Sequence, residues 1–145
     1  MLLDQILEHW EKDCKINPSE LGSESLNIPQ LHSKYLKLLI DSKKKLRSEE
    51  TKYRDLKSLK YDYYSGRLAT DDLKRLGWRP FPHKLMKADI ERAMNSDKDI
   101  EDIRIRRDQL QLTVETIEEI ISAVNKRSFH INSAMEWMKF SNGIV

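Results

Sequence analysis

Residues 43–67, KKKLRSEETKYRDLKSLKYDYYSGR, decide the fold expected for this chain. They end a run, from Gln30 to Ser65, that contains neither Gly nor Pro. Apolar residues recur in this run three, four or seven positions apart, which is the spacing of one face of a helix. We therefore predict a long basic helix over about residues 30–65, ended by Gly66, because glycine readily adopts the left-handed conformation that stops a helix.

The same stretch interleaves cationic and aromatic side chains. Cations neutralise phosphates and aromatic rings stack on bases, so this composition suits single-stranded nucleic acid. At about 100° per residue, Lys57, Tyr61 and Tyr64 share one face of the helix, while Tyr63 points elsewhere and is expected in the core. The predicted nucleic-acid contacts are Arg54, Lys57, Lys60, Tyr61, Tyr64 and Arg67.

The charge distribution is uneven along the chain. Residues 31–67 contain eleven Lys and Arg against five Asp and Glu, whereas residues 1–30 contain two against six. The overall charge of +2 thus conceals an acidic start and a basic middle. A run of charge is often only a solvated helix face, but the interleaved tyrosines favour a binding surface.

Length and composition favour one all-α domain over residues 1–145. The chain has 145 residues, 34% of them charged, with only four Gly and four Pro, which is typical of long solvated helices and not of a turn-rich β protein. A single cysteine excludes an intrachain disulfide and a thiolate zinc site, and indicates a cytosolic protein. No secretion signal or membrane span is expected.

No common catalytic signature occurs in the sequence. GxxxxGK, HExxH and GxSxG are all absent, so we expect no enzymatic activity, no metal site and no cofactor. This leaves little support for a small helical hydrolase.

A second apolar pattern lies in the C-terminal part of the chain. Between residues 100 and 124, apolar side chains fill alternating a and d positions of a heptad, interrupted at Arg107. So regular a seam predicts oligomerising helices over about residues 97–141. The predicted oligomer contacts are Ile103, Leu110, Val114, Ile117, Ile121 and Val124.

The remaining segments are expected to be short. The pattern predicts an amphipathic helix over residues 2–13, a connection over residues 15–28, a capped helix over residues 70–77 and a further helix near residues 85–94. Two prolines make residues 78–82 a loop. Trp78 and Phe81 in that loop either form an exposed docking site or fill the core between helices.

Residues 61–67, YDYYSGR, preceded by Leu59 and Lys60, resemble the signature of the UvsY recombination mediators of T-even-type bacteriophages. The similarity extends through the acidic first helix, the basic long helix, residues 97–100 (DKDI) and the closing helices, and so covers nearly the whole chain.

The resemblance implies a non-enzymatic protein of homologous recombination, repair and recombination-dependent replication that binds single-stranded DNA. The implied partners are the phage recombinase and the phage single-strand-binding protein, which is displaced while the recombinase is loaded. The resemblance also implies a ring-like homo-oligomer, a heptamer held together largely by C-terminal helices. Its location would be the cytoplasm of the infected bacterial host.

One position departs from the family pattern. Members can carry two basic residues, two positions apart, ahead of the Asp-Tyr-Tyr run; here Lys60 matches the second, but Ser58 stands at the first. Lys57 is a neighbouring substitute. The alternative function is a structural coiled-coil assembly factor without specific DNA binding.

Overall fold

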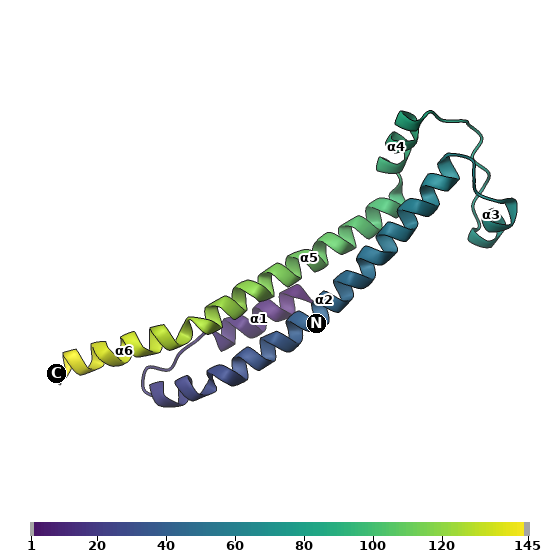
Figure 1. Ribbon diagram of the computed structural model, residues 1–145. Helices are drawn as coiled ribbons and strands as arrows, with labels where there is room; N and C mark the ends of the chain where they lie inside the picture. Colours follow the sequence, from purple (N-terminus) through teal and green to yellow (C-terminus); the bar gives the residue numbers. More distant parts are fainter. Residues whose placement is uncertain (1, 144–145) are drawn as a thin grey trace. The chain divides into compact units, whose positions relative to one another are not determined.

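The structure is a computed structural model that describes residues 2–143, and those residues form helices and no strand. The helices are α1 (Leu3–Asp13), α2 (Leu21–Tyr64), α3 (Thr70–Leu76), α4 (Lys87–Asn95), α5 (Lys98–Asn125) and α6 (Arg127–Ser141) (Figure 1). The predicted all-α fold is confirmed. The chain divides into two compact units, Met1–Lys44 with Gln111–Val145, and Lys45–Leu110, so α2 and α5 each contribute to both.

The long helix starts earlier than predicted. Residues 15–28 were expected to be mostly a connection, but α2 begins at Leu21 and contains Pro29. A proline inside a helix removes one backbone hydrogen bond. Contacts distant in sequence favour the helix nevertheless: Leu21 is buried, and Glu24 Oε2 lies 2.8 Å from Arg127 Nη2.

The other boundaries of α2 and α3 agree with the sequence patterns. Helix α2 ends at Tyr64, and Gly66 follows with φ of 75°, in the left-handed region. The capped helix predicted over residues 70–77 is α3, and Gly77 has φ of 71°. Residues 78–82 are not helical. The segment between α2 and α5, residues 65–97, is called the connecting segment below.

The first unit has its core between α1, the first part of α2, the last part of α5 and α6. Trp10 of α1 meets Tyr35 of α2 edge to face, with ring centroids 5.5 Å apart. Asp13 Oδ2, at the end of α1, accepts hydrogen bonds from Lys34 Nζ at 2.6 Å and Tyr35 Oη at 2.8 Å. The buried apolar side chains of this core are Ile6, Leu21, Leu31, Tyr35, Leu39, Val114, Ile117, Ile120, Val124 and Ile131.

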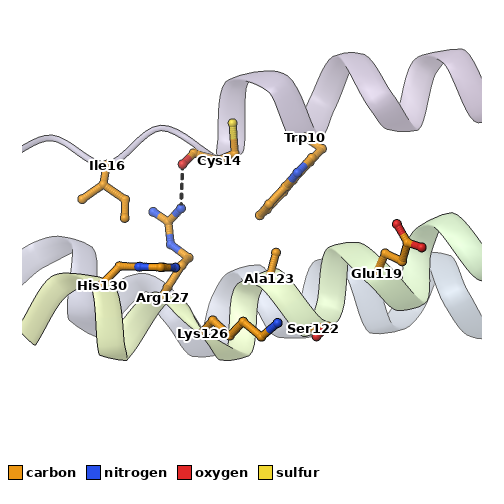
Figure 2. A pocket seen from close by; sticks show the side chains of 9 residues that line it. All are labelled: Trp10, Cys14, Ile16, Glu119, Ser122, Ala123, Lys126, Arg127 and His130. Atoms are coloured by element: carbon orange, nitrogen blue, oxygen red, sulfur yellow. Dashed lines mark hydrogen bonds between the residues drawn. The ribbon is translucent and has the colours of Figure 1, made fainter. Parts of the chain in front are cut away.

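Arg127, the first residue of α6, fixes the connection between α1 and α2. The residue is only 3% exposed. Its Nη1 donates to the carbonyl oxygens of Asp13 and Cys14, both at 3.1 Å, and its Nη2 donates to that of Lys15 at 3.4 Å. Figure 2 shows the guanidinium pointing at the Cys14 carbonyl, beside a hollow of about 430 Å³ that Trp10 also lines. The cation thus caps the C-terminal carbonyls of α1.

The heptad stripe of α5 is largely buried within the protomer. As a predicted oligomer seam it was expected to be exposed on each protomer, but Val114, Ile117 and Val124 are buried within the first unit. Ile121 in the first unit, and Ile103 and Leu110 in the second, are half-buried. The expectation of an exposed stripe was wrong because α1 and α2 already cover that face of α5.

Helix α6 carries a group of exposed apolar side chains, which includes all the exposed aromatic rings that the first unit shows among its large hydrophobic residues. This helix follows α5 closely, and its C-terminal end extends away from α1 (Figure 1). Trp137 is 67% exposed and Phe140 is 76% exposed, with their ring centroids 6.0 Å apart. Phe129, Met135 and Met138 on the same helix are also exposed. Water is a poor environment for so many large apolar side chains on one short helix.

Candidate nucleic-acid interface

The end of α2 carries the exposed cations of the predicted interface. Arg54, Lys57 and Arg67 are exposed, and Tyr61 is half-buried. On a helix, positions 54, 57 and 61 lie within about 60° of one another, so these side chains form one face. We call Arg54, Lys57, Tyr61 and Arg67 the basic strip. It lies in the second unit, which contains 17 Lys and Arg against 13 Asp and Glu.

Tyr53 lies beside this strip and is contacted by two cations. Lys57 Nζ is 5.2 Å from the centre of the Tyr53 ring, and Arg107 of α5 is 4.5 Å from it. Arg107 also donates a hydrogen bond to Asp108 Oδ1, which raises the pKa of the guanidinium. The half-buried Tyr53 ring therefore makes cation–π contacts with two positively charged side chains beside the strip.

Lys60, by contrast, is buried. It is 6% exposed, and its ammonium lies 2.9 Å from Asp99 Oδ2 and 3.0 Å from Asp97 Oδ2. The same nitrogen is 4.2 Å from the centre of the Trp78 ring. Our expectation that Lys60 faces outward with its neighbours was wrong. Lys60 lies about 60° round the helix from Lys57, and that rotation turns it toward the connecting segment and α5.

Tyr64 joins Lys60, Asp97 and Asp99 in one cluster of polar side chains. Its hydroxyl donates to Asp97 Oδ2 at 2.6 Å, and the residue is half-buried. Asp97 in turn accepts hydrogen bonds through Oδ1 from the backbone N–H groups of Asp99 at 2.9 Å and Ile100 at 3.2 Å. Asp97 therefore caps the start of α5 with one oxygen and holds two α2 side chains with the other.

The ionisation of these groups depends on their contacts. Burial opposes charge on Asp97, but the hydrogen bonds from Tyr64 and Lys60 outweigh it and lower the pKa of the carboxyl. For Lys60, burial is again opposed by the hydrogen bonds to Asp99 and Asp97, which raise the pKa of the ammonium. Burial and the bond to Asp97 raise the pKa of the Tyr64 hydroxyl. At neutral pH the cluster contains a carboxylate, an ammonium and a neutral phenol.

Three more rings complete this region of the second unit. Tyr63, expected in the core, packs on Trp78 with centroids 5.2 Å apart and on Phe81 at 5.7 Å. Its hydroxyl donates to the carbonyl oxygen of Arg79 at 2.7 Å. Trp78 and Phe81 are half-buried. Of the two roles open from the sequence, packing against a helix is therefore the one that the structure supports.

The sequence patterns missed the partners of Lys60. Asp97 and Trp78 are far from it along the chain, and Asp99 is 39 residues away. The available signal was the acidic residue three positions before Ile100, where an N-cap is expected. No periodicity within α2 could show which cation this cap would meet.

Residues 2–143 contain neither a candidate metal site nor a candidate membrane-spanning helix. No group of three or more His, Cys, Asp or Glu side chains is arranged to hold a metal ion in this range. None of the helices in the described part of the chain has both the length and the hydrophobicity that a membrane span needs.

Two long helices, a basic strip that includes a tyrosine, and a C-terminal helix with exposed apolar side chains define an all-helical protein with a candidate surface for a polyanion. The chain belongs to the UvsY family, "Recombination, repair and ssDNA binding protein UvsY", which matches residues 9–144. The family resemblance drawn from residues 61–67 is thereby confirmed.

Individual relatives agree with this family. "Recombination protein uvsY" of Enterobacteria phage T4 is 23% identical over 143 residues, 99% of this chain and 99% of the relative. The bacteriophage T4 recombination mediator protein UvsY in lattice type IV has a TM-score of 0.85 and 23% identity, covering 97% of this chain and 99% of that chain. In lattice type II, the TM-score is also 0.85, at 22% identity and 98% coverage of each chain. The two crystal structures confirm the fold over nearly its whole length.

Proposed function

We propose that this protein is a recombination mediator that binds single-stranded DNA and promotes loading of the phage recombinase onto strands covered by the phage single-strand-binding protein. The observation that carries the proposal is the match to a recombination, repair and single-stranded-DNA-binding family over residues 9–144. The protein would act in homologous recombination, repair and recombination-dependent replication, in the cytoplasm of the infected bacterial host.

The proposed DNA contacts are those of the basic strip. Arg54, Lys57 and Arg67 are exposed and can each neutralise a phosphate, while the half-buried Tyr61 offers part of its ring to a base. Lys60 and Tyr64 would support this surface without contacting DNA, because the Lys60 ammonium and the Tyr64 hydroxyl are already bound to Asp97. Binding of this kind depends on salt and only weakly on sequence, since it lacks a base-reading element.

The proposed active form is a ring-like homo-oligomer, a heptamer, assembled through α6. The exposed Phe129, Trp137 and Phe140 support this choice, because burying such rings between protomers removes large apolar areas from water. A ring also repeats the basic strip in every protomer, so that a modest affinity per strip becomes strong binding to one strand. Replacing Trp137 and Phe140 with Ser should lower the mass measured by light scattering.

The test of DNA binding is a salt titration with a fluorescent oligothymidylate. The triple variant Arg54→Ala, Lys57→Ala, Arg67→Ala should lose about 2 from the magnitude of the slope of log affinity against log salt for each protomer engaged, at about 0.7 per phosphate. A matched control, Lys15→Ala, Lys37→Ala, Lys139→Ala, removes three exposed cations from the first unit. Both variants are compared at equal oligomer mass, because loss of assembly alone would weaken binding.

Two results would contradict the proposal. If the unchanged protein binds oligothymidylate no better at low salt than at high salt, the protein is better described as an assembly factor without DNA binding. If both triple variants lose the same slope, the DNA path does not follow the basic strip.

A further inference from the structure

Lys60 connects three parts of the second unit. Its ammonium is shared between Asp97, just before α5, and Asp99, within α5, at 3.0 and 2.9 Å. It also lies 4.2 Å from the centre of the Trp78 ring, in the connecting segment, and 5.8 Å from the centre of the Tyr63 ring. A side chain from the last turns of α2 thus contacts both the connecting segment and the start of α5.

We propose that Lys60 is a positioning residue for the DNA-binding surface: its buried ammonium holds the connecting segment and the start of α5 against the end of α2, and does not itself contact phosphate. The proposal deepens the proposed function and rests on it for the part that concerns DNA. Within the basic strip, the outward charge is then supplied by Arg54, Lys57 and Arg67.

The geometry opposes direct phosphate binding by Lys60. Its side chain is 7% exposed, and that of Asp97 is 5% exposed, so a phosphate would have to enter a nearly dry site. It would also have to replace two carboxylates that already hold the ammonium at hydrogen-bond distance, and the released Asp97 would remain buried beside the phosphate. Two negative charges at such a separation repel strongly where water is excluded.

The contacts around Lys60 explain which elements it positions. Asp97 depends on Lys60 for its charge partner and caps α5 at the same time. Trp78 contacts both Lys60 and the ring of Tyr63, whose hydroxyl holds the Arg79 carbonyl. Removing the ammonium therefore loosens the cap of α5 and the packing of the loop after α3 together. Arg67 of the basic strip belongs to this connecting segment, which these contacts hold against α2.

The test compares four variants of the full chain by thermal unfolding and by salt titration with oligothymidylate. They are Lys60→Ala, Asp97→Asn, Lys60→Arg and the exposed control Lys57→Ala. A positioning role predicts that Lys60→Ala and Asp97→Asn each lower Tm by about 10 °C, the usual consequence of breaking a buried pair. Lys60→Arg should have a Tm close to that of the unchanged protein, because a guanidinium can bridge the two carboxylates. Lys57→Ala should leave Tm within about 2 °C.

The salt slopes, measured below the lowest Tm, separate positioning from contact. Lys60→Ala and Asp97→Asn should have equal slopes, although only one of them removes a cation. Lys57→Ala should lose about 0.7 from the magnitude of the slope for each protomer engaged. A slope that falls in Lys60→Ala but not in Asp97→Asn overturns the proposal, and so does an unchanged Tm in Lys60→Ala.

A failure of the proposed function would be recognised separately. If the unchanged protein does not bind oligothymidylate, the thermal data still decide the positioning role. The double variant Lys60→Ala, Asp97→Asn should then lose less Tm than the sum of the two single losses, because both changes break the same Lys60–Asp97 contact. Additive losses overturn it.

Discussion

Each of the two units contains a carboxylate held by one lysine and one tyrosine, but the two sets differ in burial. In the first unit, Asp13 accepts from Lys34 and Tyr35, with the lysine and aspartate side chains 38% and 24% exposed. In the second, Asp97 accepts from Lys60 and Tyr64, and the corresponding values are 7% and 5%. The same lysine–aspartate pair therefore has different energetic consequences, because water can replace the lost partner of the lysine only in the first unit.

The largest expected effect comes from breaking the buried set. Asp97→Ala should lower the free energy of unfolding by about 3–5 kcal/mol, since it leaves the Lys60 ammonium buried with one partner fewer and removes the cap of α5. Urea unfolding at a fixed protomer concentration measures this loss. The matched control is Asp99→Ala, whose side chain is 61% exposed and which also contacts Lys60. It should cost less than about 1 kcal/mol, and an equal loss in both variants would show that burial is not the cause.

Removing only the hydroxyl from the buried set should have a smaller effect. Tyr64→Phe keeps the ring against Phe81 and deletes the 2.6 Å bond to Asp97. A hydrogen bond to a charged acceptor contributes about 1.5–3 kcal/mol, so the loss should lie near 2 kcal/mol by urea unfolding. A loss larger than that of Asp97→Ala would mean that Tyr64, and not the ion pair, holds this region together.

The set around Asp13 should be less sensitive. In Asp13→Ala the Lys34 ammonium can turn to solvent, but the hydroxyl of the fully buried Tyr35 loses its acceptor, so the expected loss is about 1–2 kcal/mol. Circular dichroism during urea unfolding is a sufficient measurement. If Asp13→Ala lost as much free energy of unfolding as Asp97→Ala, the difference in burial between the two sets would have no effect on stability.

The smallest expected effect is the change of folding stability with pH. The pKa values of Asp13 and Asp97 are both lowered by their hydrogen bonds, so their stabilisation is complete above the unfolded pKa of about 4 and is lost as pH falls below it. The pKa values of Lys60 and Tyr64 are raised, so their stabilisation is lost only as pH rises beyond about 10. The Tm difference between the unchanged protein and Asp97→Asn should therefore narrow from pH 6 to pH 3. A constant difference over that range would exclude Asp97 ionisation as its source.

The sequence was informative wherever a pattern was local. The Gly-free and Pro-free run after Gln30, the heptad stripe of α5 and the glycine after α2 each reflect neighbours on one element, and the helices follow them. The family was also recognisable from residues 61–67 and is confirmed by the match over residues 9–144. The DNA contacts themselves remain a prediction.

The errors have a common physical origin in contacts between distant residues. Pro29 lies inside α2 because Glu24 and Leu21 find partners beyond the local sequence, Arg127 among them. Lys60 is buried because a cap 37 positions later, Asp97, turns toward it. The stripe of α5 is covered by α1 and α2 of the same chain, and helical periodicity cannot distinguish that cover from a second protomer.

Arg127 also has a consequence for the order of events during synthesis. Helix α1 has 11 residues, too few for a stable isolated helix, and its C-terminal carbonyls are capped by a side chain 114 residues further along the chain from Asp13. At about 5–20 residues per second, the ribosome adds that side chain roughly 6 to 23 seconds after Asp13. The first helix to be translated is thus among the last to receive this cap, whereas its contacts with Lys34 and Tyr35 of α2 can form much earlier.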